Sequence, residues 1–143
     1  MWHPMCSYGR SMSIRILIVD DNEVFRLPLQ RALEAAGFEV IAVPSAEDAL
    51  DVLDRRTVDL LLTDHRLPGI DGVQLLTRIK ATHPAVATIV MTAYGTIESA
   101  VEARRHGADD YLLKPFEVPD LLRALHRALD QQKQEPPAHR RSA

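Results

Sequence analysis

Polar side chains stand directly after four short apolar runs of the sequence. Asp20 and Asp21 follow the first run, Asp64 follows the second, Thr92 the third and Lys114 the fourth. In an open parallel sheet, ligands bind beyond the carboxyl ends of the strands, because loops and helix N-termini converge there. We therefore expect three carboxylates, one hydroxyl and one ammonium group to meet at one edge of a sheet.

Each of these residues also has an ordinary structural explanation. An aspartate after a strand is most often a turn residue or a helix cap, a threonine can simply end a strand, and a lysine can be a solvated charge. Three carboxylates packed together repel one another, however, unless a cation lies among them. Oxygen ligands without His or Cys favour a hard cation such as Mg²⁺ or Mn²⁺. The set as a whole therefore predicts a divalent metal site.

A metal ion and an ammonium group beside a carboxylate suggest phosphoryl transfer. An aspartate can act as the nucleophile and hold the phosphoryl group, while the two cations neutralise its oxygens. Asp64 is the better candidate nucleophile, because it ends the central apolar run, whereas the adjacent pair Asp20 and Asp21 is better suited to holding metal. The residue types by themselves leave this choice open.

Five apolar, β-branched runs predict the strands that would position these groups: residues 14–19, 39–43, 58–63, 86–91 and 110–113. Helical apolar periods lie between them, from Asn22 as a cap to Gly37, from Ser45 to about Leu53, over 72–81 and 96–106, and from 118 to about 132. Pro28 falls inside the first helix and predicts a kink or a later start. The alternation implies an α/β fold, with a parallel sheet between two helical layers.

Length and composition fit one globular domain with tails. Of 143 residues, 46% are hydrophobic; we expect a disordered leader over 1–13, a domain over 14–132 and a linker-like tail over 133–143. The net charge of −3 argues against direct nucleic-acid binding. The lone Cys6 excludes an intramolecular disulfide and a cysteine-built zinc site. Neither a secretory signal nor an apolar run of about 20 residues occurs, so we expect no membrane association and a cytoplasmic location.

Four segments resemble the receiver domain of two-component response regulators, in the same order and with the same spacing. They are residues 18–22 (IVDDN), 63–72 (TDHRLPGIDG), 91–95 (MTAYG) and 107–116 (GADDYLLKPF). The resemblance runs from about residue 14 to residue 129. It implies a flavodoxin-like, doubly wound (βα)5 fold with a five-stranded parallel sheet in the order 2-1-3-4-5.

The resemblance also implies a set of site roles. Asp64 would accept a phosphoryl group from a phosphohistidine on a sensor histidine kinase. Asp21 and Asp64 would bind Mg²⁺ directly, Asp20 would act mainly through water, and the backbone carbonyl of Arg66 would be a further ligand. Lys114, in a cis peptide bond to the proline that follows it, would pair with the phosphoryl oxygens.

The resemblance also implies which residues transmit the signal. Thr92 would move to hydrogen-bond a phosphoryl oxygen, and Tyr111 resembles the family's aromatic switch residue, although it could also be an ordinary half-buried strand aromatic. The face formed by 96–106, 110–113 and the helix from 118 would carry the output, through a homodimer or through docking. Residues 91–96 resemble receivers attached to enhancer-binding transcription regulators, which would imply a downstream output domain missing from this chain, the alternative being fusion to a sensor kinase.

Two alternatives compete with this interpretation. One is a degenerate receiver that binds its partner without phosphorylation, which the presence of all five acceptor-site residues disfavours. The other is an aspartate-dependent phosphatase acting on a separate substrate, but such enzymes carry an Asp-x-Asp motif after the first strand, whereas Asp20 and Asp21 are adjacent. We therefore expect no enzyme in the usual sense, only a phosphoacceptor that gains and loses its own phosphoryl group. His65 is expected to be a solvent-facing loop residue rather than a metal ligand.

Arg66 and Tyr94 are bulky at positions that, in the family, flank the phosphoryl group. We predict that they shield the aspartyl-phosphate from water and lengthen its life, the alternative being that both side chains point to solvent. The double variant Arg66→Asn with Tyr94→Glu should therefore release phosphate faster than the wild type. Equal release rates of inorganic phosphate would discard the shielding hypothesis.

Overall fold

The computed structural model describes residues 13–93 and 95–134, so Cys6, Tyr94 and most of the expected leader and tail lie outside the described residues. Within these ranges the strands are all parallel and form one sheet in the order β2-β1-β3-β4-β5. Their bounds are β1 Arg15–Val19, β2 Glu39–Val43, β3 Leu60–Asp64, β4 Ala87–Thr92 and β5 Asp110–Leu113. This confirms the predicted flavodoxin-like α/β fold and its strand order.

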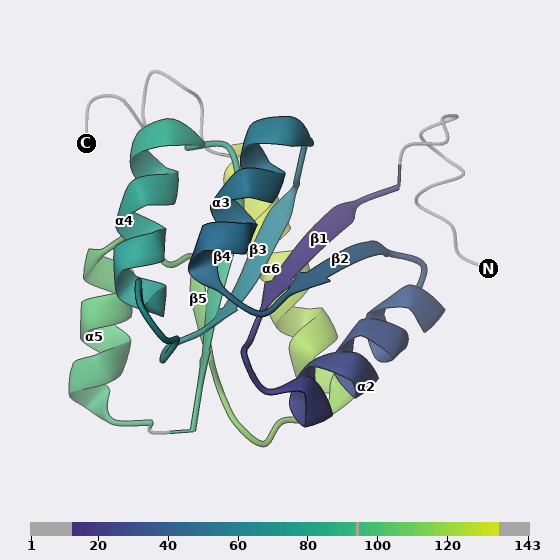
Figure 1. Cartoon of the computed structure of the whole chain (residues 1–143). Helices are drawn as coiled ribbons and strands as arrows, with labels where there is room; N and C mark the ends of the chain where they lie inside the picture. The colour runs from purple at the N-terminus through teal and green to yellow at the C-terminus, as the bar shows by residue number, and fades with distance from the viewer. Residues whose placement is uncertain (1–12, 94, 135–143) are drawn as a thin grey trace.

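Helices cover both faces of the sheet (Figure 1). On one face, α2 and α6 pack over an apolar cluster that includes Leu33 and Leu125, while α3 and α4 cover the other face around Leu53 and Leu75. The helix bounds are α2 Glu23–Ala35, α3 Ala46–Arg55, α4 Gly72–Thr82, α5 Ile97–Arg105 and α6 Val118–Gln134. The central strands are buried at all but two positions, Arg15 and Asp64, because both of their faces are covered.

Side-chain caps fix where the helices begin. Asn22 accepts a hydrogen bond from the backbone N–H of Val24, as the sequence predicted, so α2 begins at Glu23 and passes through Pro28. The later start that Pro28 suggested is therefore wrong, because the proline falls after the helix has already been capped and its first turn formed. At α4, Asp71 forms a full capping box with Gln74.

The strand register brings the polar strand ends to one edge. Val19, the last residue of β1, is opposite Thr63 of β3, and Asp64 is opposite Met91 of β4. Thr92 in turn is opposite Leu113, the last residue of β5. The residues that follow β1 and β5 therefore emerge beside the ends of β3 and β4. In the described ranges, no helix combines the length and the apolar character needed to cross a membrane.

Gly72 lies where helix α4 passes very close to the end of β3. A Cβ atom built there would be 2.3 Å from the backbone oxygen of Asp64 and 3.0 Å from that of His65. Helix propensity favours alanine over glycine by up to about 1 kcal/mol, whereas overpacking against backbone costs about 1–3 kcal/mol. We therefore predict that Gly72→Ala lowers the free energy of unfolding, measured by urea titration.

The exposed Thr77 on the same helix provides the control. Thr77→Ala should leave the unfolding midpoint nearly unchanged or raise it slightly, because alanine has the higher helix propensity and the exposed threonine hydroxyl bonds within the helix, to the Val73 oxygen. A Gly72→Ala protein as stable as Thr77→Ala would show that the close approach carries no cost.

Candidate functional site

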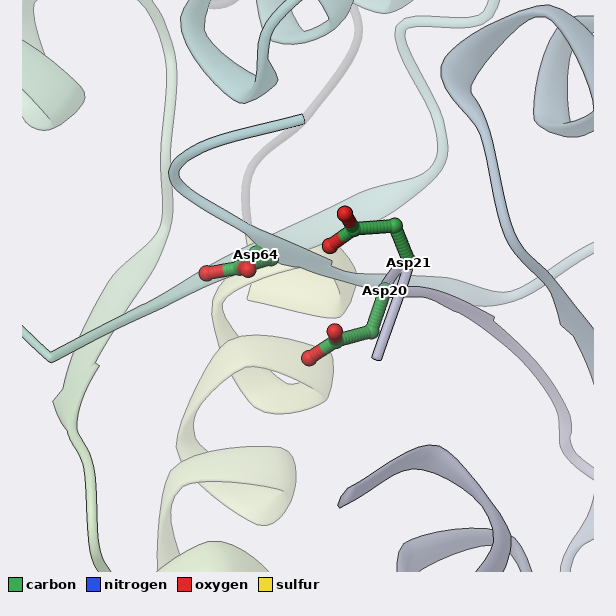
Figure 2. A group of neighbouring side chains, drawn as sticks. All are labelled: Asp20, Asp21 and Asp64. Atoms are coloured by element: carbon green, nitrogen blue, oxygen red, sulfur yellow. The ribbon is translucent and has the colours of Figure 1, made fainter. Parts of the chain in front are cut away.

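Three aspartates form an acidic cluster at the carboxyl edge of the sheet, defined here as Asp20, Asp21 and Asp64. One carboxylate oxygen from each lies within 4.8 Å of the other two. Figure 2 shows Asp20 and Asp21 on the segment after β1 and Asp64 at the end of β3. Asp20 is completely buried, Asp64 is partly buried and Asp21 is exposed. The structure thus brings together the three carboxylates that the sequence predicted would meet.

Asp20 is held from several directions. Its Oδ1 accepts a hydrogen bond of 2.9 Å from the backbone N–H of Asn22, and its Oδ2 accepts one of 2.9 Å from Lys114 Nζ. Arg26 Nη1 donates to the Asp20 backbone oxygen at 2.7 Å. A fully buried carboxylate requires such partners, because unpaired burial of a charge is very costly. Asp20 is therefore as much a structural anchor of the site as a charged member of it.

Lys114 enters the cluster from the end of β5. Its ammonium forms ion pairs with Asp20 at 2.9 Å and with Asp64 at 3.5 Å, and only 16% of its side chain is exposed. The backbone N–H of Lys114 donates to the Thr92 oxygen at 2.7 Å, and the bond from Lys114 to Pro115 is cis, as predicted. One ammonium group thus contacts two carboxylates, one that follows β1 and one that ends β3.

Burial raises the pKa of Asp64 above its ordinary value of 3.8, because removal from water disfavours the charged carboxylate. The neighbouring charge of Asp20 raises the pKa further, while Lys114 acts in the opposite direction. The folded protein consequently binds a proton at Asp64 more tightly than the unfolded chain does. Ionised Asp64 therefore lowers the stability of the fold at neutral pH.

The donor chemistry of the acidic cluster fits a hard divalent cation. The three residues offer carboxylate oxygens only, and Lys114 supplies a single positive charge against three carboxylates. Exposed Asp21 leaves one side of the cluster open to solvent. Oxygen ligands, excess negative charge and solvent access are what Mg²⁺ requires, since it keeps several of its waters. Arg66, whose carbonyl was the further expected ligand, is an exposed residue of the loop after β3, two residues after Asp64.

The two predicted switch residues occupy different places. Thr92 ends β4, is completely buried and is joined to Lys114 through its backbone oxygen. Tyr111 is a half-buried residue of β5, and its hydroxyl lies 2.6 Å from Ser99 Oγ on α5. Tyr111 thereby connects the strand that ends at Lys114 to the adjacent helix.

Two features of the site were not predicted from the sequence. The expectation that His65 faces solvent is wrong: both of its ring nitrogens are buried and have no hydrogen-bond partner among the described residues. The backbone of His65 packs closely against Gly72, whose N–H donates to the His65 oxygen. The second feature is an aromatic pair, Phe25 and Phe116, beside Lys114.

Comparisons with known proteins agree with this geometry. The family model for the response regulator receiver domain matches residues 16–126. The chain is 46% identical over 111 residues to the response regulator protein FleR of Pseudomonas aeruginosa, covering 78% of this chain and 24% of FleR. It is 42% identical over 121 residues to the DNA-binding transcriptional regulator NtrC of Klebsiella pneumoniae, covering 83% of this chain and 26% of NtrC. The chain thus spans about a quarter of the length of these curated relatives.

Solved structures show the same fold. A CheY-like receiver domain protein from Methanospirillum hungatei superimposes with a TM-score of 0.81 at 33% identity, covering 87% of this chain and all of that one. NtrX from Brucella abortus gives a TM-score of 0.80 at 35% identity, over 85% of this chain and 28% of NtrX. Together with the acidic cluster at the carboxyl edge of a 2-1-3-4-5 sheet, these matches show that the chain belongs to the response regulator receiver domain family of two-component systems.

Proposed function

We propose that this receiver domain accepts a phosphoryl group on Asp64 from a phosphohistidine of a sensor histidine kinase, in a reaction that requires Mg²⁺. The observation that carries the proposal is the arrangement at Asp64. Its carboxylate belongs to a cluster of three within 4.8 Å, and the Lys114 ammonium lies 3.5 Å away. A nucleophilic carboxylate, a fixed cation and further oxygen ligands are the groups that phosphoryl transfer needs.

In this proposal each residue has a defined task. A carboxylate oxygen of Asp64 attacks the phosphorus atom, the phosphorus–nitrogen bond breaks, and its electron pair leaves with the imidazole of the donor. Lys114 neutralises the equatorial phosphoryl oxygens, and the Thr92 hydroxyl hydrogen-bonds one of them. Asp21 and Asp64 would hold the metal ion, with Asp20 acting through water and the Arg66 carbonyl as a further ligand. Mg²⁺, when bound, supplies positive charge that offsets the phosphoryl and carboxylate charges.

The phosphoryl group would later be lost to water, so the chain acts on itself and on no separate substrate. While present, the phosphoryl group carries about −1.5 to −2 charge in place of the single charge of the carboxylate, between groups that are already closely packed. Thr92 and Tyr111 would carry that change to the face formed by α5, β5 and α6. Support for this route comes from the bond between Thr92 and Lys114 and from the contact of Tyr111 with Ser99.

The output would be a change in self-association or in docking to a further domain. One similar structure is the beryllofluoride-activated receiver domain dimer of NtrC4. The curated relatives FleR and NtrC, of which NtrC is a DNA-binding transcriptional regulator, are about four times as long as the matched segment. We infer that this domain forms a homodimer through α5, β5 and α6 when phosphorylated, or controls an output domain of that regulatory class.

The proposal predicts stoichiometric phosphorylation at one residue. Incubation with Mg²⁺ and a small phosphodonor such as phosphoramidate should add one phosphoryl group, detected by intact mass. Asp64→Asn should abolish the addition, because the amide is not a nucleophile for this reaction. Chelation of the metal should reduce it by orders of magnitude.

Asp51→Asn is the matched control, since Asp51 is an exposed aspartate on α3 with only a surface ion pair to Arg55. It should be phosphorylated like the wild type. Unmodified wild-type protein under these conditions would refute the phosphoacceptor role and favour the phosphorylation-independent binding module.

The raised pKa of Asp64 predicts how stability depends on pH without metal. Above the folded pKa of Asp64 the destabilising effect of its charge is complete, and it disappears as the pH falls through that pKa toward 3.8. Metal-free Asp64→Asn should therefore melt a few degrees above the wild type at neutral pH. The difference should shrink on acidification, as measured by calorimetry.

Addition of Mg²⁺ should reverse that order. Binding at one hundred times the dissociation constant stabilises the native state by about 2.7 kcal/mol, and it should act on the wild type far more than on Asp64→Asn. If Mg²⁺ raised both melting temperatures equally, the metal would bind elsewhere.

A further inference from the structure

Lys114 has a third neighbour besides its two carboxylates. Its Nζ lies 4.1 Å from the centroid of the Phe25 ring, over the face of that ring. We propose that Phe25 is a positioning residue for phosphoryl transfer, holding the Lys114 ammonium at the acidic cluster through a cation–π contact. This inference rests on the proposed phosphoacceptor function, and it assigns a role to a residue of α2 that carries no polar group.

The ammonium needs such a third contact. Asp20 lies 2.9 Å from Nζ and Asp64 lies 3.5 Å from it, so the two carboxylates compete for one long, flexible side chain. When Asp64 becomes phosphorylated, Lys114 must remain at hand for the phosphoryl oxygens. The face of an aromatic ring attracts a cation without competing for its hydrogen bonds to oxygen in the way another carboxylate would.

The position of Phe25 follows from the loop after β1, which carries Asp20 and Asp21 of the acidic cluster. The backbone N–H of Asn22 donates to Asp20, and the Asn22 side chain caps α2. Phe25 lies in the first turn after that cap, its own N–H donating to the Asn22 oxygen at 3.1 Å. Asp20, Asn22, Phe25 and Lys114 thus form a closed chain of contacts, in which the carboxylate and the ring approach the same ammonium.

Phe116 sets the orientation of the ring. The two rings meet edge to face, with centroids 5.8 Å apart and planes at 90°. The chain contains only three phenylalanines, and two of them meet beside this lysine. Phe116 follows the cis bond after Lys114 by one residue, so the segment that delivers the ammonium also delivers the ring that supports Phe25.

Replacing the Phe25 ring by an aliphatic side chain removes the attraction between the ring face and the ammonium but keeps an apolar side chain at that position. Leucine at position 25 would still pack against the apolar cluster under α2, but it offers the ammonium no negative face. We expect Phe25→Leu to slow phosphorylation of Asp64 by phosphoramidate about three- to tenfold. Phe25→Tyr keeps the ring and should remain within about twofold of the wild type.

Phe38→Leu is the matched control. Phe38 is partly buried against the same apolar cluster, whereas the cation–π contact of Lys114 is with Phe25. Replacement of Phe38 should therefore lower stability without slowing phosphorylation. Melting temperatures of all variants identify any loss of fold. A Phe38→Leu protein slowed as much as Phe25→Leu would overturn the proposal, because general loosening of the core would then explain both.

A second measurement keeps the shape of the side chain constant. Fluorinated phenylalanines at position 25 withdraw electron density from the ring face while filling nearly the same space. The phosphorylation rate should fall stepwise as fluorines are added. Rates independent of fluorination would refute the cation–π role, whatever the result for Phe25→Leu.

A spectroscopic measurement on the unphosphorylated protein distinguishes failure of this inference from failure of the proposed function. A methylene group beside an ammonium over a ring face has its proton resonances shifted upfield by the ring current. The Lys114 ε-protons should show that shift in the wild type and in Phe25→Tyr and lose it in Phe25→Leu. Absence of the shift in the wild type would refute the contact itself, even if Asp64 is phosphorylated normally.

Discussion

Repulsion among three carboxylates at one sheet edge is the constraint on which the rest of this molecule depends. Asp20 is fully buried and therefore needs partners on both of its oxygens, which Asn22 and Lys114 provide. Asp64 shares the same ammonium at a longer distance, and burial raises its pKa because that sharing does not replace the lost hydration. The negative charge of the three carboxylates is thus only partly balanced by Lys114, and an excess of negative charge favours cations.

The fold provides this crowding through the register of its strands. Parallel register aligns the ends of β1, β3, β4 and β5, so the groups that follow them emerge together. Gly72 lets α4 begin in contact with the backbone of Asp64, and its capping box fixes that start. Because the core strands are covered on both faces, the acidic edge cannot relieve its repulsion by spreading apart.

Much of this arrangement could be predicted from the sequence, because it depends on regular features. Strand ends, the Asn22 cap and the placement of Asp20, Asp21, Asp64 and Lys114 all follow from apolar periodicity and from polar residues at its boundaries. Other features depend on packing across long sequence distances, which periodicity does not describe. His65 was expected in solvent and has buried ring nitrogens, and the pairing of Phe25 with Phe116 joins residues 91 positions apart. The late helix start that Pro28 suggested was wrong for a local reason, because the Asn22 cap upstream of the proline determines where α2 begins.

Lys114 connects the acidic cluster to strand β5. Its ammonium contacts carboxylates that follow β1 and end β3, its backbone is bonded to Thr92 at the end of β4, and it directly follows β5. Any change of charge at Asp64 must therefore alter the forces on a residue that is covalently continuous with β5. On that strand, Tyr111 is bonded to Ser99 of α5, while Asp110 is paired with Arg127 of α6. A charge added at the acidic edge thus acts on the strand that holds both helices of the proposed output face, which explains how a modification of one carboxylate could be sensed at a surface that does not contain it.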